Sequence, residues 1–325
     1  MNLVRAEISR LTTRRFVQLM VVLLLGAFVV TAATTVVTSH RPSPSEIAFA
    51  EKEAEHVRSE MTRAYPKCRA ELDSSRYPGN PLDCEALHPA RVDPANFLHE
   101  VFIFKRDIKA LMYLLVAFLA LFGFLVGASY IGADLNSGGL TNLLLWRPQR
   151  MQVLGAKLGT LLGGVLVVLV VASALYLGMF WAIAKFGGLT GNLDGEFWRW
   201  LGLFSARGGL LVLGVTALGF AIAMLGRHTA AALGVVAAYA IVWEAGARIV
   251  MEVVDAAHPE QWMLSTYLAA WMTGSVNLWG SIECDTGFCS SMQTLTWRHA
   301  AAVFGVLFVG SVVAAFANFR RRDLA

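Results

Sequence analysis

The sequence predicts an all-α polytopic membrane protein with six transmembrane helices, N- and C-termini in the cytoplasm, and one extracytoplasmic insertion. Of its 325 residues, 56% are apolar and 15% are charged, whereas a soluble domain is usually about 45–50% apolar and about 25% charged. The apolar residues occur in six long blocks, and each is long enough to cross a hydrocarbon core of about 30 Å. Helices are expected because the backbone hydrogen bonds of a spanning segment must close within it.

Residues 1–15 form the first expected element, an amphipathic helix in the cytoplasmic interface of the bilayer. Apolar residues such as Ile8 and Leu11 share this segment with charged residues such as Glu7 and Arg10, a pattern typical of interfacial helices. The first transmembrane helix follows at residues 16–37. A cleaved secretory signal is the alternative, but the apolar core of a signal usually has about 7–15 residues. We therefore expect an uncleaved anchor.

Residues 38–108 form the extracytoplasmic domain. The segment His40–Asp107 holds 12 of the 23 acidic residues, together with ten basic residues. This polar, highly charged stretch lies between two apolar blocks, so we expect it to be solvated.

Residues 109–325 contain the other five spans, which we place at about residues 109–131, 153–180, 201–226, 230–250 and 298–319. Orientation follows from Lys and Arg near the ends of the spans, which collect on the cytoplasmic side. Eleven such residues lie on one side, namely Arg5, Arg10, Arg14, Arg15, Arg147, Arg150, Lys157, Arg227, Arg320, Arg321 and Arg322. The chain is therefore expected to be a multi-pass protein of the cell membrane. We also expect that membrane to be a bacterial inner membrane.

The segment at about residues 251–297 is expected on the outer side, because Met251–Trp297 contains five acidic residues and no Lys or Arg. Gln261–Trp279 is apolar enough to suggest a seventh span, but a seventh span would move the final arginines outside. We interpret it instead as a short re-entrant or interfacial pair of helices, anchored by tryptophans.

All four cysteines fall on the predicted outer side, where disulfides are stable. Four cysteines permit three pairings, and we favour the local ones, Cys68 with Cys84 and Cys284 with Cys289. A zinc site at the second pair is the alternative, although no neighbouring His or second Cys pair supports it.

Several chemistries have no motif in this chain. The sequence has no phosphate-binding G-x4-G-K-[ST] loop, no H-E-x-x-H zinc motif and no complete nucleophile elbow. No basic cluster is interleaved with stacking aromatics, so nucleic acid is not an expected partner. Glu252, Asp255 and His258 are compatible with a metal site, but such a trio is more often a solvated helix end. We expect no catalytic residue, cofactor or metal in this chain.

Charged residues inside a span are costly and therefore informative. Glu244 and Arg248 lie four residues apart in the fifth span, which permits an intrahelical pair. Three interpretations remain open: a structural pair near the outer leaflet, a polar lining of a substrate path, or part of a proton relay. Glycines at four-residue spacing, at Gly123/Gly127 and at Gly155/Gly159/Gly163, mark faces where helices can pack closely.

The cytoplasmic turn at about residues 132–150 carries the most specific pattern. It contains Asp134, Gly139, the pair Leu144-Leu145, and then Arg147, Pro148 and Arg150, with Lys157 beyond. The leucines predict a short amphipathic helix that ends near Pro148. A leucine face with a charged end suits docking on another protein.

This arrangement resembles the permease subunits of ABC-2 type transporters, a family of ATP-driven exporters. Their pattern is an acidic residue, a glycine with a small neighbour, a leucine pair, Pro-x-Arg and a later Lys. The acid is more often Glu in the family, so Asp134 is a conservative departure. The basic amphipathic start, the six spans and the closing Phe319-Arg320-Arg321-Arg322 also match.

The resemblance implies that two permease chains, expected as a homodimer, assemble with two cytoplasmic ABC ATPase subunits in the lipid bilayer. ATP and Mg are then expected in the ATPases. The implied ATPase-coupling residues are Glu7, Arg10, Asp134, Gly139, Leu144, Arg147, Pro148 and Arg150. Arg147 and Arg150 would be docking contacts, and Glu7 and Asp134 salt-bridging positions. For the two arginines, the alternative role is to set topology and bind headgroups.

The expected function is therefore export of a hydrophobic or amphiphilic substrate, such as a lipid, drug or peptide antibiotic. A non-transporting membrane scaffold or assembly factor, whose outer domain binds a partner, is the main alternative. An intramembrane enzyme is disfavoured because the catalytic motifs above are missing.

Overall fold

The computed structural model describes residues 3–73, 81–139, 149–254, 256, 258–284 and 287–321. Within them, six helical segments are long and apolar enough to cross a membrane, which confirms the predicted six spans. They are α2 (Arg15–Val37), α5 (Phe104–Asn136), α7 (Arg150–Gly187), α8 (Gly195–Gly226), the continuous run Thr229–Val253, and α12 (Trp297–Arg321). Several of these helices extend beyond the predicted apolar blocks, because polar residues at the bilayer surface continue the helical turn.

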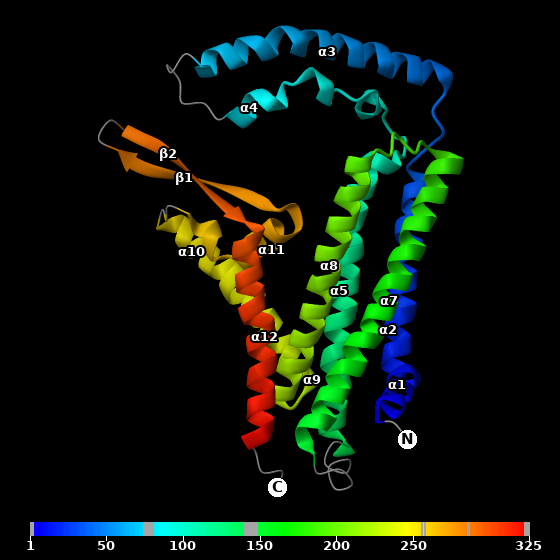
Figure 1. Ribbon diagram of the computed structural model, residues 1–325, viewed down its shortest axis with the longest axis vertical. Coiled ribbons are helices and arrows are strands. Elements are labelled where there is room, and N and C mark those ends of the chain that lie inside the picture. Colours follow the sequence, from blue (N-terminus) through cyan, green and yellow to red (C-terminus); the bar gives the residue numbers. More distant parts are fainter. Residues whose placement is uncertain are drawn as a thin grey trace. The chain divides into compact units, whose positions relative to one another are not determined.

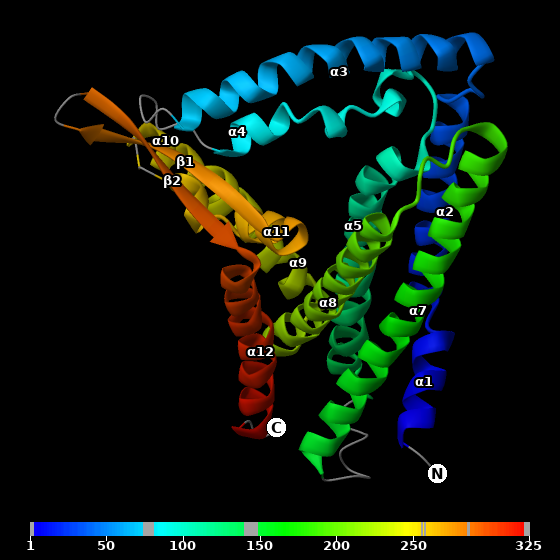
Figure 2. The same ribbon diagram turned by 45° about the horizontal axis from the view of Figure 1, so that its top comes forward.

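The chain forms two compact units, and the borders between them fall inside helices or at their first turns. The first unit contains residues 1–27, 113–174 and 198–325, and the second contains residues 28–112 and 175–197. In the first unit, the short N-terminal helix α1 (Leu3–Thr13) and the adjoining parts of α2, α5 and α7 run side by side (Figures 1 and 2).

Helices α5 and α8 are the most buried of the spans. About half of the apolar window of each is buried, 56% and 50%, compared with 6–22% for the other four. Glycines permit this packing: a Cβ on Gly123 would lie 2.2 Å from Thr216 Oγ1, and one on Gly127 would lie 2.5 Å from the Thr216 carbonyl oxygen. The predicted close contact at Gly123 and Gly127 is thus present. A Cβ on Gly155, Gly159 or Gly163 would meet nothing within 4 Å, so the second glycine ladder is not packed against any of the residues that the structure describes.

The fifth span is not a uniform α-helix. It begins as α9 (Thr229–Ala238), continues as the π-helix η3 (Tyr239–Ala247) and ends as α10 (Arg248–Val253). A π-helix has one more residue per hydrogen-bonded turn than an α-helix. Residues five apart therefore share a face in η3, which changes the pairing of the charged residues there.

A hairpin follows the fifth span where only helices were expected. After the 3₁₀ turn η4 (Pro259–Trp262) and helix α11 (Leu264–Thr273), strands β1 (Ser275–Cys284) and β2 (Gly287–Thr296) pair antiparallel, with Ser275 opposite Thr296. The expected pair of short helices is correct for η4 and α11 and wrong for the residues after Gly274. The alternation Ser-Val-Asn-Leu from Ser275 onward favours a strand. Val276 and Leu295 pack at the base of the hairpin with residues of α11 and α12.

The second unit contains the polar insertion. Its long helix α3 (Pro44–Asp73) is followed by the short elements α4 (Pro81–Ala86), η1 (Pro89–Arg91) and η2 (Pro94–Phe97). Helix α3 begins with a capping box, in which the Ser43 amide donates to the Glu46 carboxylate at 2.7 Å and the Glu46 amide donates to Ser43 Oγ at 3.3 Å. Figure 1 shows α4 beside the second half of α3.

Cys68 of α3 and Cys84 of α4 form a disulfide, in agreement with the favoured local pairing. The side chains of Cys284 and Cys289 lie outside the described residues, so their pairing remains a prediction. A small apolar core joins Ala50 of α3 to Leu98, Val101 and Ile103, which ties the insertion to the start of α5.

Candidate functional site: a buried charge cluster on the N-terminal helix

Helix α1 presents one acidic side chain inward. Glu7 is 1% exposed and lies on the same face as the buried Leu11, because residues four apart align on an α-helix. Arg5 and Arg10 are exposed. The helix is therefore amphipathic as predicted, but its single carboxylate belongs to the buried face.

Lys157 of α7 is the partner of this carboxylate. It is completely buried, and its Nζ lies 2.8 Å from Glu7 Oε2 and 2.6 Å from Asp134 Oδ2 of α5. Removing charges from water is expensive, and a buried charge persists only when it is paired and hydrogen-bonded. One ammonium group thus binds two carboxylates from two other helices.

Two further side chains complete the site. The Tyr130 hydroxyl donates to the Glu7 carboxylate, and the Arg14 guanidinium donates both to the Asp134 carboxylate and to the Tyr130 carbonyl oxygen, the latter at 2.9 Å. The Arg14 Cζ and Lys157 Nζ atoms lie 4.7 Å and 5.1 Å from the centre of the Tyr130 ring, within cation–π range. We call Glu7, Arg14, Tyr130, Asp134 and Lys157 the buried charge cluster.

The buried charge cluster is electrically balanced, with two carboxylates and two cations. Such a balance is what a low-dielectric site requires, and removal of one buried partner typically costs about 3–5 kcal/mol because an unpaired charge remains. Chemically, the arrangement holds α1 against α5 and α7. The two helices that it binds, α5 and α7, flank the segment 137–149.

The structure brings several of the predicted coupling residues together. Glu7 and Asp134 meet through Lys157, and Arg10 lies 3.4 Å from Glu7. Gly139 is at the end of the described segment, and Arg150 begins α7. Leu144, Arg147 and Pro148 lie outside the described residues, so the predicted short helix there is not described.

Sequence reasoning did not assign Arg14 or Tyr130 to this site. A signal for Tyr130 exists, because it stands four residues before Asp134 and therefore on the same helical face. Arg14 looked like one of several topology-setting arginines. Its position between α1 and α2 distinguishes it, because there its side chain reaches α5.

Glu244 and Arg248 of the fifth span do not form the predicted intrahelical pair. Glu244 accepts from the Tyr239 hydroxyl at 2.7 Å and from the Ser265 amide at 3.3 Å. Arg248 instead pairs with Glu252 at 3.1 Å. The Glu244–Arg248 pairing is thus wrong: the π-helix aligns Glu244 with Tyr239, five residues earlier, and Arg248 falls in the following α-helix.

An apolar groove adjoins the buried charge cluster. It has a volume of about 820 Å³ and lies between the α1–α2 segment on one side and α5 and α7 on the other. Gly159 and Gly163 line it, and these are two of the glycines at which an added Cβ would meet none of the described atoms. Thr160 of α7, three residues after Lys157, also lines the groove, so an apolar surface lies beside the buried ion pairs.

Among the described residues, no group of His, Cys, Asp and Glu side chains is arranged to hold a metal ion. Glu252 is the partner of Arg248, and Asp255 lies outside the described residues. The predicted absence of a metal site remains a prediction.

The comparison with known families agrees with the geometry. The family model described as ABC-2 family transporter protein matches residues 1–324. The match therefore includes α1, the buried charge cluster, all six spans and the polar insertion. No curated protein matches the chain.

Proposed function

The chain belongs to the ABC-2 transporter family, and we propose that it is the permease half of an ATP-driven exporter whose driving force enters through the buried charge cluster. A permease component of an ABC transporter is the function that its family gives. The proposal adds a separate ATPase as partner, the route of the force, and the class of substrate.

The single observation that carries the proposal is the double pairing of Lys157 with Glu7 and Asp134. Helix α1 has an exposed basic face with Arg5 and Arg10, which suits contact with an ATPase at the membrane surface. Its buried face is bound to α5 and α7. A push on α1 or on the segment between α5 and α7 would therefore move these helices together.

The proposed assembly has two permease chains and two ATPases. Six spans are half of the twelve that the family resemblance implies, and four of the spans leave most of their apolar surface uncovered. Such surface requires lipid or another helix around it. ATP and Mg would be bound by the ATPases, and this chain would carry out no chemistry itself.

The proposed substrate is hydrophobic or amphiphilic, and the proposed location is the cell membrane of a bacterium. Support for the substrate comes from the apolar groove beside α1 and from the few charges within the spans. The disulfide in the insertion supports an oxidising environment on that side of the membrane.

A double variant, Glu7→Gln/Lys157→Met, tests the route of the force. It removes the bond between α1 and α7, yet Asp134 and Arg14 still neutralise each other. With the permease purified together with its ATPase, we expect assembly to persist and the coupling of ATP hydrolysis to transport to fall.

The matched control is Lys185→Met on the same helix, whose ammonium lies over Trp181 and takes no part in the cluster. Arg147→Glu/Arg150→Glu tests docking separately, and we expect it to prevent assembly. Normal coupling in the Glu7→Gln/Lys157→Met variant would contradict the proposed route. Full activity of the purified permease without any ATPase would contradict the proposal as a whole. It would favour a membrane scaffold or another class of membrane protein.

A further inference from the structure

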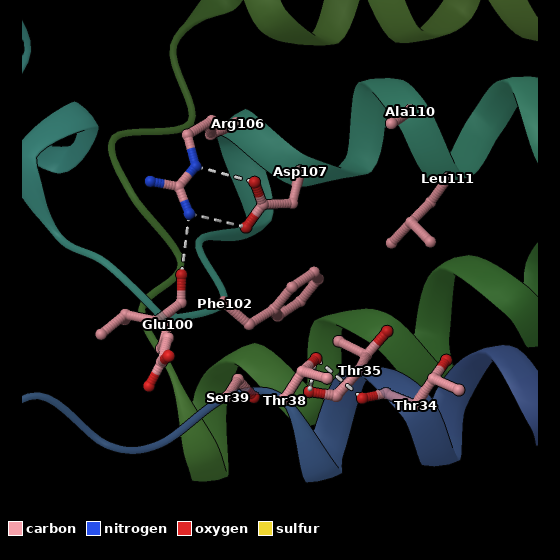
Figure 3. A pocket seen from close by; sticks show the side chains of 11 residues that line it. Thr34, Thr35, Thr38, Ser39, Glu100, Phe102, Arg106, Asp107, Ala110 and Leu111 are labelled. Carbon is pink, nitrogen blue, oxygen red and sulfur yellow. Dashed lines mark hydrogen bonds and ion pairs between the residues drawn. The ribbon is translucent and has the colours of Figure 1, made fainter.

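A cavity of about 360 Å³, with polar and apolar lining residues, lies in the second unit, where α2 ends and α5 begins. Figure 3 shows its two walls, with hydroxyl side chains of α2 on one side and Arg106, Asp107, Ala110 and Leu111 of α5 on the other. The connecting residues Glu100 and Phe102 close it. Its volume is within the range of small-molecule sites, about 300–1,000 Å³.

The α2 wall offers hydrogen-bond acceptors. Thr34 and Thr35 each donate their hydroxyl proton to the Thr31 carbonyl oxygen, at 2.9 Å and 2.8 Å, and Thr38 donates to the Thr34 carbonyl oxygen at 2.8 Å. A hydroxyl has one proton and two lone pairs. Since each proton is already used within the helix, these oxygens can only accept from a ligand.

The guanidinium on the opposite wall has no donor left for a ligand. The Nε of Arg106 donates to Asp107 at 2.7 Å, Nη1 donates to the carbonyl oxygens of Ala95 and Leu98, and Nη2 donates to Val101 and Asp107. These five bonds use all five N–H groups of an arginine. Arg106 and Asp107 also neutralise each other, so the pair adds no net charge to the cavity.

Glu100 is an exposed residue that lines the cavity and adds one negative charge to it. Its carboxylate has no hydrogen bond or ion pair among the residues that the structure describes, and its backbone has φ of 55°. That left-handed conformation is uncommon for a residue other than glycine, and such strain concentrates at functional sites. The backbone is held there because the His40 amide donates to the Glu100 carbonyl oxygen at 2.9 Å.

Part of the cavity lining is apolar. Phe102 and Leu111 are nearly completely buried and line the cavity together with the polar groups. A ligand that fills the site must therefore combine a hydrogen-bond-donating cation with an apolar portion.

We propose that this cavity binds a protonated primary amine that carries an apolar chain, with the ammonium at Glu100 and the α2 hydroxyls. A phosphate, sulfate or carboxylate would find at most the Ser39 hydroxyl as a side-chain donor among the lining residues described. The proposal concerns a site apart from the buried charge cluster and does not rest on an ATPase partner.

The test uses the full-length protein in phosphatidylcholine nanodiscs and measures saturable binding above that of protein-free nanodiscs. Dodecylamine is the probe, and dodecyltrimethylammonium and dodecyl sulfate are its comparisons. We expect dodecylamine to bind best, the trimethyl compound to bind more weakly because it has no N–H donor, and the sulfate to show no saturable binding.

Three variants distinguish a loss of the binding site from a loss of the folded structure. Glu100→Gln should weaken dodecylamine binding about tenfold, the usual scale for loss of a charged hydrogen-bond partner. Glu100→Gly should weaken it equally while it relieves the backbone strain, so a loss of binding there cannot result from misfolding. Glu51→Gln, at an exposed position of α3, should leave binding unchanged.

A second set of nanodiscs, with phosphatidylethanolamine added, identifies the source of the amine. Competition with dodecylamine would support a lipid headgroup as the ligand, and no competition would support a free amphiphilic amine. Equal dodecylamine affinity in the wild type and in both Glu100 variants, or saturable binding of dodecyl sulfate, would overturn the proposal.

Discussion

Lys157 Nζ lies 2.8 Å from Glu7 Oε2, although 150 residues separate the two in the sequence. The same ammonium contacts Asp134, so the N-terminal helix and the helices on both sides of the segment 137–149 share one buried charge. The amphipathic start of the chain is thus part of the membrane-embedded structure. Movement of α1 relative to α7 requires that this bond break or that both elements move as one.

Replacement of Lys157 by Met should strongly destabilise the protein. The variant leaves Glu7 and Asp134 with Arg14 as the one cation of the buried charge cluster and with the exposed Arg10 at its edge, and the expected loss is about 3–5 kcal/mol. The free energy of unfolding in mixed micelles measures it. The double variant Glu7→Gln/Lys157→Met should be less destabilised than the single variant, because its remaining charges balance. An equal or greater loss in the double variant would show that charge balance is not the cause.

Two glycine substitutions should have opposite consequences. In Gly127→Ala the new Cβ would lie 2.5 Å from the Thr216 carbonyl oxygen, and because backbone cannot move aside easily, we expect a loss of about 1–3 kcal/mol. In Gly159→Ala the Cβ would meet nothing within 4 Å, and we expect a change within about 0.5 kcal/mol. Unfolding of the isolated chain compares the two, and similar losses would contradict the α5–α8 packing.

Glu244 should stabilise the first turn of α11. Its carboxylate accepts from the Ser265 amide, and the Tyr239 hydroxyl that it orients accepts from the Leu264 amide at 3.1 Å. Loss of a helix-capping group typically costs about 0.5–2 kcal/mol. In Glu244→Ala, hydrogen exchange at the start of α11 should accelerate. Glu252→Gln, which alters only the Arg248 pair, is the control and should leave that exchange unchanged.

Asp194 should make stability depend on pH only under acidic conditions. The hydrogen bond from the Lys105 ammonium, and after it the one from the Phe197 amide, holds the pKa of the Asp194 carboxyl below its ordinary value. A lowered pKa in the folded state stabilises the protein fully above the ordinary carboxyl pKa, near about 4. That contribution is lost as the pH falls through the lowered value.

The measurement compares the unfolding of the wild type and Asp194→Asn across pH. The difference between them should be constant from about pH 6 to 8 and should shrink below about pH 4. The difference should be small, because the carboxylate is exposed to water. A difference that grows toward low pH would contradict the sign of the pKa shift.

The sequence was sufficient for the spans because their signal is local. Each is a run of apolar residues with no competing structure in lipid, so hydropathy identifies α2, α5, α7, α8 and α12 directly. The hairpin at Ser275–Thr296 was missed because its apolar residues, read with those of α11, also fit an interfacial helix. The π-helix at Tyr239–Ala247 was missed because its apolar sequence also fits a plain α-helix, and the hydrogen bonds of Tyr239 and Glu244 with Leu264 and Ser265 are not encoded locally.

The site was only partly predictable for a similar reason. A motif placed Glu7 and Asp134 among the salt-bridging residues, but it did not say that Lys157 would bind both. Arg14 and Tyr130 join them through contacts 116 and 123 residues apart in the chain. Such pairings arise from how the helices pack, which periodicity along one helix does not encode.

The π-helical segment also sets how the fifth span tolerates changes in its length. An α-helix turns by about 100° per residue, and η3 absorbs one extra residue without passing that rotation on. Deletion of a single residue between Tyr239 and Glu244 would let the span become a plain α-helix, in which the two side chains, then four residues apart, would still share a face. An insertion or deletion elsewhere in the same span would instead rotate all later residues of the span about the helix axis. The π-helical stretch is therefore where a change in chain length would disturb the structure least.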